Sequence, residues 1–152
     1  MGHESGAVQG LPGLGPVQQM ETVKFLRDNN HIVRRGVIVH KDTDDFSRPP
    51  GSEHKLKGGL VVVRVEAGVN KNLYVDPLHP DAPLVADVKE AGILMESFSM
   101  HGPDGVRVNK SATVLIHGFV DELSLVFGTA VPAYIDALKA ALHLVEFFKP
   151  VP

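Results

Sequence analysis

Two apolar runs, separated by a polar segment, dominate the pattern of hydrophobic and polar positions along the chain. They extend from Gly92 to Phe98 and from Ala112 to Val120, and the turn-forming sequence His101-Gly102-Pro103-Asp104-Gly105 lies between them. Apolar, β-rich runs bounded by turn residues are typical of strands. We therefore predict two strands of one sheet.

The second run carries apolar side chains on both faces of the predicted strand. Because side chains alternate along a strand, one face receives Ala112, Val114 and Ile116. The opposite face receives Thr113, Leu115, His117 and Phe119. Neither face is simply polar, so the pattern favours a small barrel or sandwich, or a sheet covered by a helix or a neighbouring subunit.

Other segments with a strand pattern precede these two. They are His31 to His40, interrupted by Gly36, then Leu60 to Glu66, and a short run from Asn72 to Val75. In the strongly β-patterned second segment, Leu60, Val62, Arg64 and Glu66 share one face. We expect the other face, with Val61, Val63 and Val65, to point into the core.

One helix is predicted near the end of the chain, from Pro132 to Val145. Proline suits the first turn of a helix, and an apolar stripe at helical spacing follows, formed by Ile135, Leu138, Leu142 and Val145. The final residues Glu146 to Pro152 add a short strand. The predicted class is α+β, with a small barrel-like or mixed β core, one C-terminal helix and a flexible N-terminal arm.

The arm is the Gly/Pro-rich segment Met1 to Met20, and residues 21–152 form the single β-rich domain that follows. Such a composition cannot bury enough apolar area to offset its ordering entropy. Apolar side chains nevertheless recur at three-residue intervals, at Val8, Leu11, Leu14 and Val17. The segment is either a leader of no consequence or an arm that orders in a groove or on the edge of a partner's sheet.

Composition excludes several classes of protein. The chain has 152 residues, enough for one domain, with 43% hydrophobic and 22% charged residues. Its net charge of -3 argues against a nucleic-acid binder, and it has no cysteine for disulfides or thiolate sites. No apolar run is long enough to span a bilayer, and we expect no standard signal peptide.

Candidate chemistry is sparse. The 8 histidines show no helical pair and no carboxylate motif of the zinc-enzyme kind, so we predict no metal site. His117 lies inside an apolar strand and Asp121-Glu122 follows it, which permits a His–carboxylate pair. The chain has no Gly-x-Ser-x-Gly nucleophile elbow and no phosphate-binding glycine loop with its lysine. We predict no catalytic residues and no cofactor.

Several short β-runs and turn glycines resemble one known family. They are Gly36-Val37-Ile38-Val39, Gly59-Leu60-Val61-Val62-Val63 with Ala67-Gly68, Ala91-Gly92-Ile93-Leu94 with Glu96, and Ala112-Thr113-Val114-Leu115-Ile116-His117-Gly118-Phe119-Val120 with the terminal helix. In these features the chain resembles the head decoration (capsid-stabilising, cement) proteins of tailed bacteriophages, the family of the phage lambda decoration protein. The resemblance covers roughly Ile32 to Phe148. The long loop Lys41 to Lys57 and the long leader depart from the shortest members of the family.

The resemblance implies a virion protein made in the bacterial cytoplasm and bound as a homotrimer to the outside of the expanded capsid. It would clamp the major capsid protein at three-fold sites against the pressure of packaged DNA, without contacting nucleic acid or membrane. It implies that the N-terminal arm, with Val8, Leu11, Leu14 and Val17, orders on the capsid. His117 and Phe119 would then supply part of the trimer interface.

Two alternatives from other classes stay open. The first is a small β-barrel module that binds a sugar or a nucleotide. The second is an enzyme that uses His117 with Asp121 or Glu122.

Overall fold

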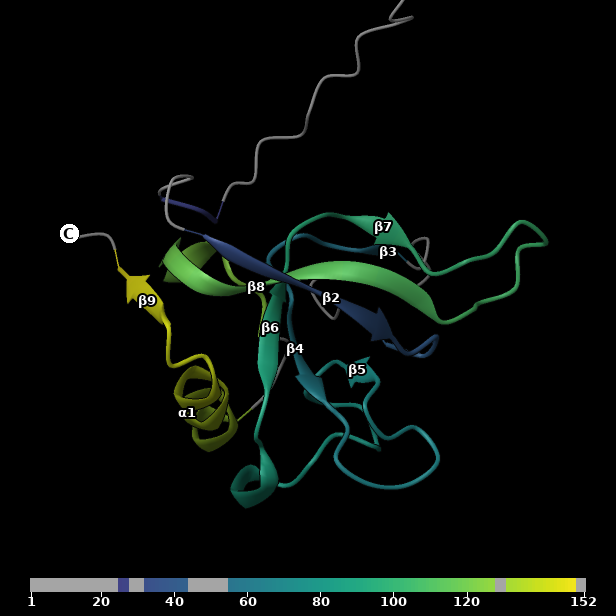
Figure 1. Cartoon of the computed structure of the whole chain (residues 1–152), viewed down its shortest axis with the longest axis horizontal. Coiled ribbons are helices and arrows are strands. Elements are labelled where there is room, and N and C mark those ends of the chain that lie inside the picture. Colours follow the sequence, from purple (N-terminus) through teal and green to yellow (C-terminus); the bar gives the residue numbers. More distant parts are fainter. Residues whose placement is uncertain (1–24, 28–31, 44–54, 128–130, 150–152) are drawn as a thin grey trace, which may run out of the picture.

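The computed structural model describes residues 25–27, 32–43, 55–127 and 131–149. It is a sheet-rich fold with a single helix in this part of the chain, which is consistent with the predicted α+β class (Figure 1). The proposed arm, with Val8, Leu11, Leu14 and Val17, lies outside the described residues, as does most of the loop Lys41 to Lys57. The elements are β2 (Val33–Val39), β3 (Lys55–Leu56), β4 (Val61–Arg64), β5 (Tyr74–Val75), η1 (Val85–Asp87), β6 (Ala91–Leu94), β7 (Phe98–Ser99), β8 (Lys110–Asp121), η2 (Glu122–Ser124), α1 (Pro132–Ala141) and β9 (Val145–Phe148).

The main sheet closes on itself in a ring. Its strand order is β2-β5-β4-β6-β8-β9, and β2 also pairs with β8 in antiparallel register. The long strand β8 therefore closes the ring, because it pairs with β6 and also with β2. Strand β9 lies outside the ring and pairs in parallel with the last residues of β8. The prediction that the two central runs supply strands of one sheet is confirmed for β6 and β8, which are antiparallel neighbours.

Both faces of β4 are largely buried. Val61 and Val63 of β4 enter one apolar cluster with Leu138 of α1, and Val62 between them enters a second cluster with Val37 and Val39 of β2. The prediction that Val61, Val63 and Val65 face the core is therefore confirmed, but the opposite face, with Leu60 and Val62, is buried as well. A strand covered on both sides reads as a continuous apolar run rather than an alternating one, and Val62 is 0% exposed.

Two predicted elements end earlier than their apolar patterns suggested. The run Gly92 to Phe98 is divided between β6 in the main sheet and β7, which pairs with β3 in a separate sheet. Helix α1 ends at Ala141, and Val145 belongs to β9 instead. Val145 still packs in the same cluster as Leu138, so helical spacing could not show that the backbone had changed.

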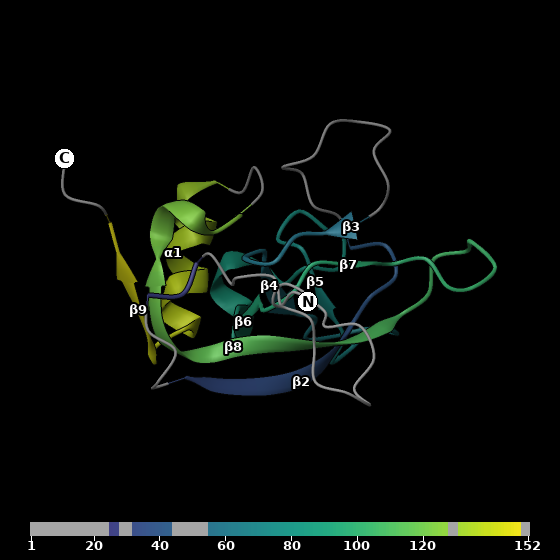
Figure 2. The same ribbon diagram turned by 90° about the horizontal axis from the view of Figure 1, so that it is seen from above.

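Helix α1 covers only one side of the sheet formed by β8 and β9, and no described element lies over the other side (Figure 2). No helix in the described ranges is both long and apolar enough to cross a membrane.

Candidate self-association surface

A break in the pairing of β2 with β8 decides which side chains of β8 reach the surface. Arg34 lies opposite Leu115, but the next residue of β2, Val33, lies opposite His117, so the register shifts there. Ile116 is the additional residue on β8, which is the arrangement of a β-bulge. Beyond a bulge, the alternation of side chains is displaced by one residue.

The bulge separates two residues that the sequence placed on one face. Leu115 is fully buried in the cluster that contains Leu138 of α1, whereas His117 lies opposite Val33, which is 49% exposed. Val120 returns to the cluster of Leu115 although strict alternation would place it on the other side. The prediction that Leu115, His117 and Phe119 share a face is therefore wrong for Leu115, because alternation does not continue through Ile116.

His117 and Phe119 lie on the side of the β8–β9 sheet away from α1, with residues from three other segments. We call Val33, His117, Phe119, Phe148 and Arg27 the outer aromatic face. The rings of Phe119 and Phe148 contact each other with centroids 5.9 Å apart, and the Arg27 guanidinium carbon lies 4.9 Å from the centroid of Phe148. Aromatic pairs and arginine over an aromatic ring are both enriched in protein–protein interfaces.

Charged side chains border this face. Arg27 Nε lies 3.2 Å from Asp121 Oδ1, and Glu146, which pairs with Phe119 across the sheet, is exposed. The backbone of residues 25–27 runs along β8, since the Arg27 N–H donates to Phe119 O and the Asp121 N–H donates to Phe25 O. The outer aromatic face therefore has an apolar centre and a polar rim, as protein interfaces have.

Glu122 forms ion pairs with α1 and with the residue that follows β9. Its carboxylate binds Lys139 of α1 and Lys149, whose Nζ lies 3.1 Å from Glu122 Oε2. Hydrogen bonding to Lys139 lowers the pKa of Glu122, and Lys149 adds to the effect. The two carboxylates that the sequence permits as partners of His117 have cationic partners: Arg27 for Asp121, and two lysines for Glu122.

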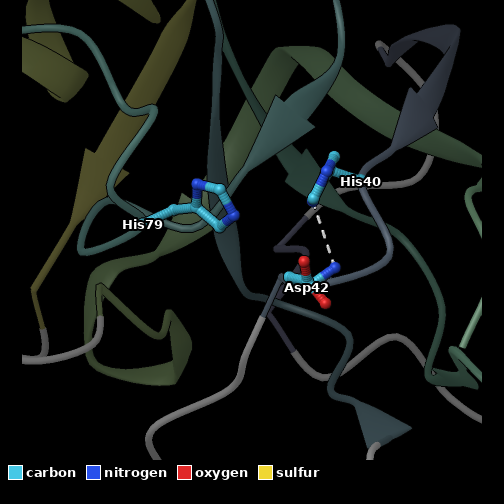
Figure 3. Close-up of side chains that lie close together, drawn as sticks. All are labelled: His40, Asp42 and His79. Carbon is cyan, nitrogen blue, oxygen red and sulfur yellow. Dashed lines mark hydrogen bonds between the residues drawn. The ribbon is translucent and has the colours of Figure 1, made fainter. Parts of the chain in front are cut away.

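A second polar group, which the sequence did not reveal, lies at the opposite end of β2. His40, Asp42 and His79 come together there (Figure 3). Burial lowers the pKa of His40, and the neighbouring His79 contributes in the same direction. The pairing of β2 with β5 brings these residues together, and their positions along the chain follow no metal-binding motif. Among the described residues, these three form the group whose ligand atoms lie close enough together to hold a metal ion.

Comparison with known proteins adds no relative. No family model matches the chain, and no curated protein matches it.

Proposed function

We propose that this chain is a trimeric head decoration protein that binds the outside of an expanded phage capsid at three-fold sites and stabilises it against internal DNA pressure. The observation that carries the proposal is the outer aromatic face, which offers a partly exposed pair of phenylalanines at the edge of a closed sheet. We also infer that the ring of strands is the barrel-like core of such a protein. The chain would act on the virion surface after synthesis in the host cytoplasm.

In this proposal, the outer aromatic face forms one side of the contact between subunits. A closed trimer brings one face of each subunit against a different face of the next. The outer aromatic face provides one of the two, with Phe119 and Phe148 as anchors and Arg27 as a further contact. Aromatic and arginine side chains contribute most often to the energetic centre of an interface.

The N-terminal segment provides the contact with the major capsid protein in this proposal. Each of three arms uses Val8, Leu11, Leu14 and Val17, so one trimer makes several weak contacts at once. Linked weak contacts add as avidity and give tight binding without any single strong contact.

Co-sedimentation with emptied, expanded capsids tests the capsid role. The capsids are assembled from the major capsid protein encoded in the same genome as this chain. We expect the full chain to pellet with them and a version lacking Met1 to Met20 to stay in solution. If the full chain stays in solution at every salt concentration, the capsid role is rejected.

Substitutions on the outer aromatic face test self-association separately. We expect Phe119→Ser to abolish the trimer on the capsid, read by chemical cross-linking of the bound protein. The matched control is Leu84→Ser, which changes another apolar side chain, 74% exposed, away from this face. If Phe119→Ser cross-links as the unmodified chain does, the outer aromatic face is not the trimer contact.

A further inference from the structure

Two histidines and an aspartate meet where β2 and β5 end. These strands are parallel neighbours, with Val39 opposite Tyr74, so their carboxyl ends lie at the same edge of the sheet. His40 follows β2 directly, Asp42 lies in the turn after it, and His79 lies in the turn after β5. Figure 3 shows the two imidazole rings close to each other, with Asp42 beside them.

The separations are close to those of a metal site. One ligand atom from each of His40, Asp42 and His79 lies within 4.8 Å of the other two. Zinc bound at about 2.0–2.2 Å places its ligand atoms roughly 3.3 Å apart in a tetrahedron. The three groups must therefore approach one another by at most about 1.5 Å. Asp42 is exposed, and rotation of its side chain supplies part of this movement.

Backbone hydrogen bonds hold both histidine-bearing turns in place. The His40 N–H donates to Tyr74 O at 2.9 Å, the Thr43 N–H donates to His40 O at 3.0 Å, and the His79 N–H donates to Asp76 O at 3.1 Å. His40 is 6% exposed and the side chain of His79 is 8% exposed. The two rings are thus fixed with their centroids 5.0 Å apart, and the exposed Asp42 leaves the cluster open to solvent on one side.

Each ring has one lone pair to offer. Nδ1 of His40 accepts the N–H of Asp42 at 3.1 Å, and Nδ1 of His79 accepts the N–H of Asp81 at 3.0 Å. A neutral imidazole has one proton and one lone pair, so an ion that binds through either ring nitrogen displaces the backbone N–H from Nδ1. The net stabilisation from such a neutral bond is small, and water can accept from the released N–H.

We propose that His40, Asp42 and His79 form a site for one divalent transition-metal ion, with zinc as the best fit and water at the remaining position. Two imidazole nitrogens and one carboxylate oxygen are ligands that zinc prefers. The bound ion connects the carboxyl ends of β2 and β5, at a place where only one residue pair joins these strands. It stabilises the ring-like sheet whether or not the protein binds a capsid.

Metal titration of the full, untagged chain tests this site after treatment with a chelator and dialysis. We expect calorimetry with Zn²⁺ to give one strong site per chain, and Co²⁺ to give the visible absorption of a tetrahedral complex. Asp42→Asn and His79→Gln should each weaken Zn²⁺ binding at least tenfold. The control, His143→Gln, changes an exposed histidine that is not part of the cluster and should leave binding unchanged.

Thermal unfolding distinguishes a structural site from scattered binding by the other histidines. Zn²⁺ should raise the unfolding temperature of the unmodified chain and of His143→Gln, but not that of His79→Gln. Asp42 is exposed, so Asp42→Asn retains the fold and keeps the test valid if His79→Gln unfolds. The proposal is overturned if the unmodified chain binds no Zn²⁺, or if Asp42→Asn binds it as tightly as the unmodified chain.

Discussion

Gly92 in β6 is required by the close approach of a neighbouring strand, and replacing it with alanine should destabilise the protein. A Cβ atom at this position would lie 2.6 Å from both Cβ and Cγ2 of Val114 in β8. Carbon atoms pack best at about 3.5–4.0 Å, so the strands would have to separate by roughly 1 Å. Val114 is 0% exposed and cannot turn away into solvent.

The expected cost follows from overpacking. An additional methyl group in a well-packed core costs about 1–3 kcal/mol, and the loss of glycine flexibility in the unfolded chain returns about 0.4–1 kcal/mol. We therefore expect Gly92→Ala to lower the free energy of unfolding by about 1–2 kcal/mol. Gly36→Ala in β2 is the matched control, because a Cβ atom there meets nothing within 4 Å.

A double-mutant cycle identifies the cause. Val114→Gly removes both atoms that the new methyl group would strike, at a cost of about 2.4 kcal/mol for three buried carbons before any cavity term. In Gly92→Ala/Val114→Gly the added methyl group occupies part of the space left by valine. The double variant should therefore be more stable than the sum of the single changes predicts, by at least about 1 kcal/mol.

Urea unfolding followed by far-ultraviolet circular dichroism measures the unmodified chain and the four variants, since the chain has no tryptophan to report by fluorescence. The midpoint and the slope of each curve give the free energy of unfolding, provided the transition is two-state. The reasoning is refuted if Gly92→Ala is as stable as Gly36→Ala. It is also refuted if the effects in the double variant simply add.

Two further substitutions test individual contacts. Hydrogen bonding to Lys139 lowers the pKa of Glu122, so its stabilisation is present above its ordinary pKa of 4.5 and is lost as the pH falls through the lowered value. Glu122→Gln should cost about 1.5–3 kcal/mol at neutral pH and flatten the acid limb of a pH series of urea curves, and an unchanged acid limb would contradict this. The Tyr134 hydroxyl donates to Pro83 O at 2.6 Å, and burial raises the pKa of Tyr134 to about 12. The stabilisation that the protonated Tyr134 provides is therefore lost as the pH rises from the ordinary pKa of 10.0 toward 12. Tyr134→Phe should cost about 0.5–1.5 kcal/mol at neutral pH and remove the higher step from an ultraviolet titration of tyrosinate; persistence of that step would assign it to Tyr74.

Local pattern was sufficient for most of the elements. The strands β2, β4, β6, β8 and β9 could be predicted because runs of β-branched, aromatic and other apolar residues lie between turn residues. Proline at the start of α1 placed the beginning of the helix correctly, at Pro132. The end of the helix was not readable, because Val145 continues the apolar stripe from a strand that packs in the same cluster.

What the sequence could not show depends on contacts between distant segments. The bulge at Ile116 arises from the pairing of β8 with β2, and no residue in β8 marks it before that pairing is known. The same holds for His40 and His79, which meet only because β2 and β5 are parallel neighbours. Periodicity describes one strand at a time, whereas both candidate sites depend on which strands lie beside each other.

The bulge gives β8 two roles that a regular strand could not combine. Before the bulge, consecutive residues point to opposite faces: Val114 fills one apolar cluster and Leu115 the other. Both faces of this part of β8 therefore contribute to stability. After it, Val120 maintains the contact with the helix side while Phe119 faces outward beside Phe148. Without the displacement by one residue, Phe119 would share the face of Leu115 and Val120 would point away from α1. An aromatic side chain can therefore lie on the surface of this sheet without leaving a gap in the core.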